Sequence, residues 1–188
     1  GLPSPTYTIN TPVVNAAGPQ NGAAVGSQLV LSGANLQGAT LVNFSDGNGG
    51  QIAAAVTQVS ADGTSVTVTV PAGAKTGDLT VVAIAGNATY PNYTIIQPPT
   101  ITQLSAVDVS TGKAVVTLTG SNYTSATQVS FAGFNATSFE IVSDTVIKAV
   151  IPPGFNTGPV TVTNPAGNAT STVLIDTFSE VKNFIGTD

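Results

Sequence analysis

The residues that do most enzyme chemistry are scarce in this sequence. It has no His and no Cys, so the usual general bases, nucleophile partners and zinc ligands are missing. Most of its nine carboxylates stand beside Gly, Ser or Thr in expected turns, where Asp caps its own backbone. The nine are Asp46, Asp62, Asp78, Asp108, Glu140, Asp144, Asp176, Glu180 and Asp188. A glycosidase pair among them would need a deep cleft, which a small β-sandwich does not offer, so we expect no enzyme.

One short segment has oxygen ligands at close spacing. Asp46 and Asn48 alternate with glycines, and calcium binds carboxylate and amide oxygens of this kind. The segment lacks an acidic or amide residue at its fifth position and a Glu at its twelfth, which excludes a loop of the EF-hand type. Calcium held by Asp46 and Asn48 is therefore one hypothesis, and a simple β-turn is the other. No other cofactor is indicated.

Aromatic side chains are the candidates for binding. Phe134 and Phe155 each precede Asn in expected loops and suggest a contact patch for a protein partner. The alternative is that each ring is half-covered by its own loop. Sugar platforms usually need rows of flat aromatic rings, and this chain has no Trp and only four Tyr. Polysaccharide binding is therefore weakly supported.

The C-terminal tail has a helical pattern. Thr177–Glu180 has the form of a capping box, and Gly186 is a fitting stop. Phe178, Val181 and Ile185 lie on one face of such a helix. A helix of about eight residues is marginal alone, so this apolar face would contact its own domain or a partner. A disordered tail is the alternative.

Charge and composition restrict the possible partners and the location of the protein. The net charge is −5, and four Lys with no Arg cannot match a phosphate backbone, so nucleic acid is excluded as a partner. No apolar run approaches the ~18 residues that a membrane span needs. The absence of Cys fits an exported protein, and a chain that starts at Gly1 points to processing. We expect an extracellular or cell-surface location, with a neutral surface that tolerates close packing against copies of itself.

The strongest signal is an internal repeat. Leu31–Leu36 (LSGANL) matches Leu118–Tyr123 (LTGSNY) 87 positions further on. Val70–Gly77 (VPAGAKTG) matches Ile151–Gly158 (IPPGFNTG) at a spacing of 81. The first copy therefore has six extra residues, in a turn-rich stretch that a surface loop tolerates.

The repeated segments alternate apolar and polar residues, which is typical of strands. Val, Ile and Thr are frequent, and Gly and Pro interrupt them at short intervals, as in an all-β sandwich or barrel. Gly33 and Gly120 are expected to end strands, and Pro71 and Pro152 to terminate others because Pro cannot donate to a ladder. Expected strands include Leu29–Leu31, Val66–Val70, Leu79–Ile84, Val115–Leu118, Val146–Ile151 and Val160–Thr163.

These blocks, in this order, resemble the IPT/TIG family. The motifs are SGANL or TGSNY, then VNF or VSF, then VPAGAKTGDLTV or IPPGFNTGPVTV, then AGNAT. The resemblance implies two tandem immunoglobulin-like β-sandwiches of the E-set type, and a place in a bacterial-type surface protein. The expected domains are residues 12–98 and 99–175, followed by a tail at 176–188. Residues 1–11 are an extension or the last strand of a preceding module, since Tyr7–Thr11 resembles Tyr93–Gln97.

Three functions fit these features. The first is a non-catalytic structural or adhesive segment of a surface layer, fibre or adhesin, which contacts other copies or other domains of the same surface protein. The second is an accessory module pair of a secreted polysaccharide-active enzyme, with surface polysaccharide as its ligand. The third is a decoration or tail protein of a phage virion. Tandem β modules, low charge and the Pro98-Pro99 junction favour the first.

Overall fold

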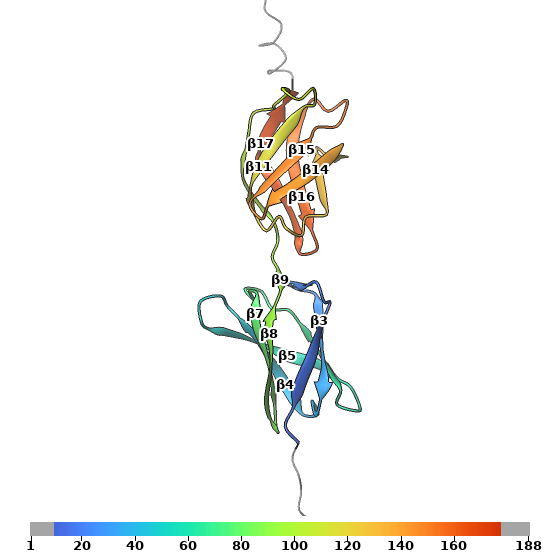
Figure 1. The fold of residues 1–188 in the computed structure, drawn as a ribbon, viewed down its shortest axis with the longest axis vertical. Coiled ribbons are helices and arrows are strands. Elements are labelled where there is room, and N and C mark those ends of the chain that lie inside the picture. Colours follow the sequence, from blue (N-terminus) through green and yellow to red (C-terminus); the bar gives the residue numbers. More distant parts are fainter. Residues whose placement is uncertain (1–9, 178–188) are drawn as a thin grey trace, which may run out of the picture. The chain divides into compact units, whose positions relative to one another are not determined.

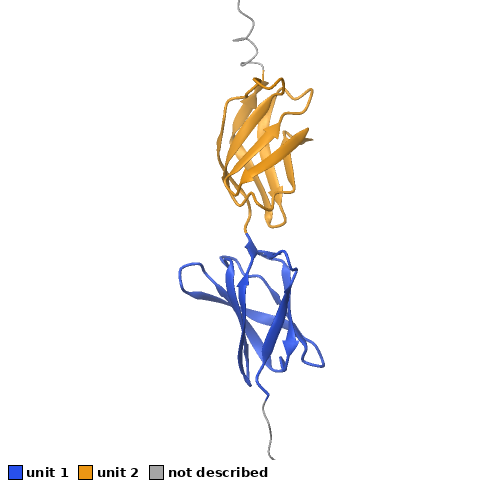
Figure 2. Cartoon of the chain, in the orientation of Figure 1, with its two compact units in different colours: residues 1–96 blue, residues 97–188 orange. Residues whose placement is uncertain are grey.

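The computed structural model describes residues 10–177, which are built from β-strands. The chain divides into two compact units, residues 1–96 and 97–188 (Figure 2). The all-β prediction is confirmed. Two expected elements lie wholly or mostly outside the described residues. They are the strand within residues 1–11 and the helix with Phe178, Val181 and Ile185. No helix within residues 10–177 is long and apolar enough to cross a membrane.

Unit 1 is built around one seven-stranded sheet and a two-stranded pair (Figure 1). The order in the sheet is β1-β3-β6-β5-β4-β7-β8, with antiparallel neighbours, and β2 pairs with β9 in parallel. The two ends of the sheet approach each other, since β1 contacts β8. The strands are β1 (Val13–Gly18), β2 (Ala23–Ala24), β3 (Gln28–Ala34), β4 (Ala39–Ser45), β5 (Gln51–Val59), β6 (Ser65–Thr69), β7 (Gly77–Ala83), β8 (Gly86–Tyr93) and β9 (Ile95–Ile96).

The core of unit 1 follows from the alternation of its strands. Successive side chains of a strand point to opposite faces, so Val66 and Val68 of β6 are fully buried between exposed or half-buried Thr and Ser. Leu29 and Leu31 of β3 are fully buried in the same way. Phe44 on β4 completes this core with no exposed surface.

The longest strand of unit 1 is β5, with 9 residues. Its first half pairs with β4, from Gln51 opposite Ser45 to Ala55 opposite Leu41. Its second half pairs with β6, after a bulge that follows Val56. The single strand β5 therefore pairs with β4 and with β6. The turn-rich residues 46–50 form the hairpin loop that leads into it.

Unit 2 is a sandwich of two separate four-stranded sheets. One has the order β10-β11-β15-β14 and the other β13-β12-β16-β17. Two strands, β13 and β14, stand where unit 1 has β5, and each pairs with one sheet only. The strands are β10 (Thr100–Leu104), β11 (Val115–Ser121), β12 (Gln128–Phe131), β13 (Phe134–Asn135), β14 (Ser138–Ser143), β15 (Val146–Val150), β16 (Thr157–Asn164) and β17 (Gly167–Asp176).

The repeated Gly does not end a strand as expected. Gly33 lies inside β3 and Gly120 inside β11. A Cβ atom at Gly33 would overlap the carbonyl of Val13, and one at Gly120 would overlap the carbonyl of Thr100. Gly is therefore required because the first strand of each unit crosses directly over this position.

The Asn of the same motif fastens the entry of each unit. Asn35 and Asn122 have φ angles of 59° and 61°, a left-handed conformation that Asn tolerates. The side-chain nitrogen of Asn35 donates to the carbonyl of Thr11 at 3.0 Å, and that of Asn122 donates to the carbonyl of Pro98 at 2.8 Å. The motif thus holds the chain at the residue before Pro12 in unit 1 and before Pro99 in unit 2.

Candidate interaction surfaces

Several carboxylates of the described residues are held by their own turns, as Asp62 and Asp108 show. The backbone N–H of Thr64 donates to Asp62, and hydrogen bonds from Ser60 and Thr64 lower the pKa of the Asp62 carboxyl. Hydrogen bonds from Ser110 likewise lower the pKa of Asp108. Within residues 10–177, no group of three acidic residues gathers where it could hold a metal ion. These carboxylates therefore act as turn caps.

Asp144 caps a longer connection in unit 2. Burial raises its pKa, but hydrogen bonds from Thr124, Asn122 and Tyr123 outweigh this and lower the pKa overall. Its Oδ1 accepts the hydroxyl of Thr124 at 2.8 Å and the backbone N–H of Thr124 at 3.1 Å. Asp144 thereby fixes the segment that contains the anchoring Asn122.

The segment proposed for calcium is a hairpin loop between β4 and β5. Asp46 Oδ1 accepts the backbone N–H groups of Asn48 at 2.8 Å and Gly50 at 2.9 Å. The backbone N–H of Asp46 donates to the carbonyl of Gly50 at 3.2 Å. Asn48 is exposed at the tip. These bonds give Asp46 a role in closing the turn, and calcium at Asp46 and Asn48 stays a prediction.

The two Phe residues proposed as a contact patch lie in different environments. Phe155 is only 7% exposed and packs edge-on against Phe131, with ring centroids 5.4 Å apart. It belongs to the core of unit 2 because its ring fills the space under its own loop, so it offers no contact surface. Phe134 is 62% exposed on β13. The proposed patch therefore depends on Phe134 without Phe155.

Phe134 is positioned by a tight hairpin. It pairs with Phe131 across the turn Ala132-Gly133, in which both residues have positive φ angles, 46° and 88°. This is the geometry that two-residue hairpins favour. Phe131 is buried in the core, while Phe134 stays exposed. The sequence did not reveal the turn, since Ala at its first position is not a turn signal.

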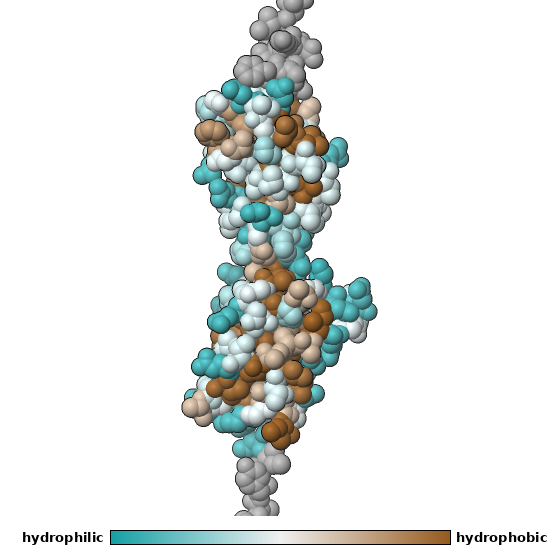
Figure 3. Space-filling model, turned by 180° about the vertical axis from the view of Figure 1, so that it is seen from behind, coloured by the Kyte–Doolittle hydropathy of each residue, from teal (hydrophilic) through white to brown (hydrophobic). Residues whose placement is uncertain are grey.

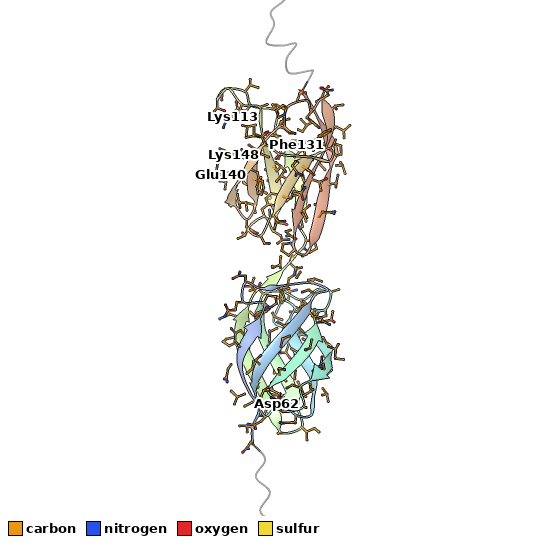
Figure 4. The ribbon with its side chains drawn as sticks, turned by 90° about the vertical axis from the view of Figure 1, so that its right-hand side faces the viewer. Asp62, Lys113, Phe131, Glu140 and Lys148 are labelled. Carbon is orange, nitrogen blue, oxygen red and sulfur yellow. The ribbon has the colours of Figure 1, made fainter. Side chains whose placement is uncertain are left out.

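One sheet of unit 2 exposes both charged and apolar side chains. Glu140 on β14 lies opposite Lys148 on β15, and their side chains lie near each other in Figure 4. On the same strand, Ile141 and Val142 are 36% and 52% exposed. Figure 3 shows apolar side chains scattered among polar ones on the visible face of each unit. This surface is neither strongly charged nor uniformly apolar.

Unit 2 has a hollow that the sequence did not predict. It lies between the chain that follows β10 and the end of β17, which are edge strands of different sheets. Its volume is about 200 Å³. Val173 and Leu174 beside it are 60% and 58% exposed. Its lining consists of Leu104, Ser105, Ala106, Val107, Val173, Leu174, Ile175 and Asp176. We call this feature the seam of unit 2.

Comparison with known proteins identifies the second unit. Residues 99–179 match the family model of the IPT/TIG domain. This match and the two packed sheets confirm the predicted immunoglobulin-like fold there. No curated protein matches the chain.

Several solved structures are distantly similar. SGBP-B from a xyloglucan utilization locus of Bacteroides uniformis has 17% identity and a TM-score of 0.39, over 86% of this chain and 48% of that one. A surface glycan-binding protein from Prevotella bryantii has 18% identity and a TM-score of 0.39, over 88% of this chain and 42% of that one. Murine CEACAM1b has 16% identity and a TM-score of 0.33, over 88% and 97%. The chain thus spans less than half the length of the two bacterial proteins.

Proposed function

We propose that the chain, whose residues 99–179 match the IPT/TIG domain, is a non-catalytic, extracellular structural segment of a surface protein. It acts by spacing and by contact with other copies, or with other domains of the same surface protein. One observation carries this proposal. The same Gly–Asn anchor is built twice, at Gly33 with Asn35 and at Gly120 with Asn122. Several of the described acidic residues cap turns, as Asp46 and Asp62 do. Two domains are built alike, and their described residues gather no set of reactive groups. Such domains are suited to a repeated structural segment that acts by contact.

Unit 1 is, in this proposal, a second IPT/TIG domain. Phe44 and Phe131 occupy matching positions and are both fully buried. Gly73 and Gly154 have φ angles of 86° and 81° in matching turns. The equivalence of the two units therefore extends from the Gly–Asn anchor to the core and to a turn later in the repeat. They support a duplication of one fold, with the six-residue insertion as the main difference.

The surface supports contact between neutral faces. The chain has four Lys and nine acidic residues, so like charges do little to keep neighbours apart. Exposed β-branched side chains such as Val142 and Val173 add apolar area. Among residues 10–177, Phe134 is the one aromatic residue classed as exposed, so a row of rings for stacking sugars is not formed there.

Electron microscopy of the purified chain, with and without calcium, tests this function. We expect ordered sheets or filaments at high protein concentration. Binding is measured in parallel on gels that contain xyloglucan or mixed-linkage glucan. A particle that stays monomeric and is retained by either polysaccharide would instead support an accessory carbohydrate-binding module.

A further inference from the structure

The chain has two Asn-Gly pairs, Asn21-Gly22 and Asn48-Gly49. Asn is one of the thermolabile residues, because the backbone nitrogen of the next residue can attack the carbon of its side-chain amide. Gly as the next residue favours this attack, since it has no Cβ atom to shield the nitrogen and its backbone adopts many conformations. Asn21 and Asn48 are both exposed. The environment of the attacking nitrogen therefore decides which pair reacts.

The nitrogen of Gly49 is open in the hairpin loop between β4 and β5. The N–H groups on either side of it are held, because Asn48 and Gly50 donate to Asp46 at 2.8 Å and 2.9 Å. The N–H of Gly49 itself forms no hydrogen bond with the described residues. Gly49 is exposed, and beyond its chain neighbours no atom lies within 4 Å of the place where a Cβ would stand. Its nitrogen can therefore reach the side chain of Asn48 without first breaking a bond.

The nitrogen of Gly22 is closed off by the fold. Its N–H donates to the carbonyl of Pro19 at 3.1 Å. Gly22 is buried, and a Cβ atom there would lie 2.8 Å from the carbonyl oxygen of Thr94. The next residue is fixed as well, since the N–H of Ala23 donates to the carbonyl of Thr94 at 3.1 Å. Attack on Asn21 therefore requires this segment to open locally first.

We propose that Asn48 is a site of spontaneous deamidation and that the fold protects Asn21 from the same reaction. The backbone nitrogen of Gly49 loses its proton to solvent base and forms a bond to the side-chain amide carbon of Asn48. The bond from that carbon to the amide nitrogen breaks, and the nitrogen takes a proton from water and leaves as ammonia. The product is a cyclic succinimide. Water then opens this ring at either of its two carbonyl carbons, which gives aspartate or isoaspartate at position 48.

Deamidation changes the charge and the backbone of this loop. A carboxylate replaces a neutral amide two residues from Asp46, which adds one negative charge to the chain's net charge of −5. The isoaspartate product also inserts the side-chain methylene into the backbone. This inference does not depend on the proposed structural role, because it involves the loops of unit 1 alone.

Peptide mapping by mass spectrometry tests the site. The folded full-length chain is incubated in warm, mildly alkaline buffer, then denatured and cut with chymotrypsin, which cleaves after Phe44 and separates the two Asn-Gly pairs. We expect deamidation at Asn48 to be at least about fivefold faster than at Asn21, the factor that one hydrogen bond of ordinary strength supplies. Equal rates at the two positions, or no product at Asn48, would overturn the proposal.

The unfolded chain shows whether the fold causes the difference. The incubation is repeated in guanidinium chloride, where neither nitrogen is held, and the two rates should become nearly equal. A difference that persists unchanged there would come from the local sequence and would overturn the protection of Asn21. Asn48→Ser is the control variant, and it should lose the fast gain of negative charge while circular dichroism stays unchanged. A fast charge change that remains in this variant would place the reactive site elsewhere.

Discussion

The side-chain nitrogen of Asn122 donates a 2.8 Å hydrogen bond to the carbonyl of Pro98, the residue at which the chain enters unit 2. Asn164 adds a second bond to this entry. It is 4% exposed, and its side-chain nitrogen donates to the carbonyl of Gln97 at 2.8 Å and to that of Asn122 at 3.2 Å. Two amide side chains therefore fasten the start of this domain to its interior.

Loss of the Asn122 side chain should destabilise unit 2. Asn122→Ala removes the bond to Pro98 and forces Ala into a left-handed conformation, which together cost about 2 kcal/mol. Asn122→Gly removes the same bond but keeps the conformation free of strain. We expect the Gly variant to lose about half as much stability in urea unfolding followed by circular dichroism. Equal losses would show that backbone strain plays no part.

Two buried tyrosines should respond in opposite directions to loss of their hydroxyl. Tyr93 donates to the carbonyl of Pro19 at 2.6 Å, so Tyr93→Phe should cost about 1 kcal/mol. Tyr123 is fully buried and its hydroxyl has no hydrogen-bond partner. Tyr123→Phe should therefore be neutral or stabilising by up to about 1 kcal/mol. Thermal unfolding of both variants checks this, and a large loss for Tyr123→Phe would reveal a partner such as a buried water.

The same tyrosines predict weakening of the fold in strong alkali. Burial raises the pKa of Tyr93 and of Tyr123 from 10.0 to about 12. A raised pKa means that the folded protein holds the proton more tightly, so its contribution to stability is full below pH 10. That contribution falls as the pH rises from about 10 to about 12. Urea midpoints measured across this range should decline, and less steeply in the Tyr93→Phe/Tyr123→Phe double variant.

Ala132 predicts a simple stabilising change. Its φ angle of 46° strains any residue with a Cβ atom, by about 1 kcal/mol or more. Ala132→Gly should therefore raise the melting temperature of unit 2 and leave Phe134 in place. Ala136→Gly is the control, because Ala136 is not among the residues with positive φ. An equal effect of the two changes would contradict the predicted strain.

Asp46 allows the turn and the calcium hypotheses to be separated. Asp46→Ala should lower the stability of unit 1 by about 1 kcal/mol, because the N–H groups of Asn48 and Gly50 lose their acceptor. Asp46→Asn keeps an acceptor oxygen and should lose less. Melting curves with a chelator and with added calcium complete the test. A calcium-dependent rise that disappears in Asp46→Asn would establish calcium at this loop.

The repeat made much of the fold predictable. Alternation at Val66–Val70 predicted a strand, because burial of one face imposes a period of two on the sequence. The matched Pro71 and Pro152 predicted where two strands end. The burial of Phe44 and Phe131 followed from the same matching. The role of Gly33 was misjudged because the approach of β1 involves residues far apart in sequence, which local turn signals do not record.

The candidate surfaces were less predictable. Phe155 differs from its counterpart Ala74, and this difference suggested a contact, yet both side chains are buried. The Phe155 ring fills volume in the core. A comparison of the two copies shows that a residue is larger, but not whether the larger side chain is buried or exposed. The seam brings together the chain after β10 and the end of β17, which lie far apart in sequence, so local patterns do not record it.

The parallel pair of β2 and β9 also has a mechanical consequence. Force applied to the two ends of unit 1 would pull these neighbouring strands in opposite directions along their own axes. Their hydrogen bonds would then bear the load together, in shear, and would have to rupture at the same time.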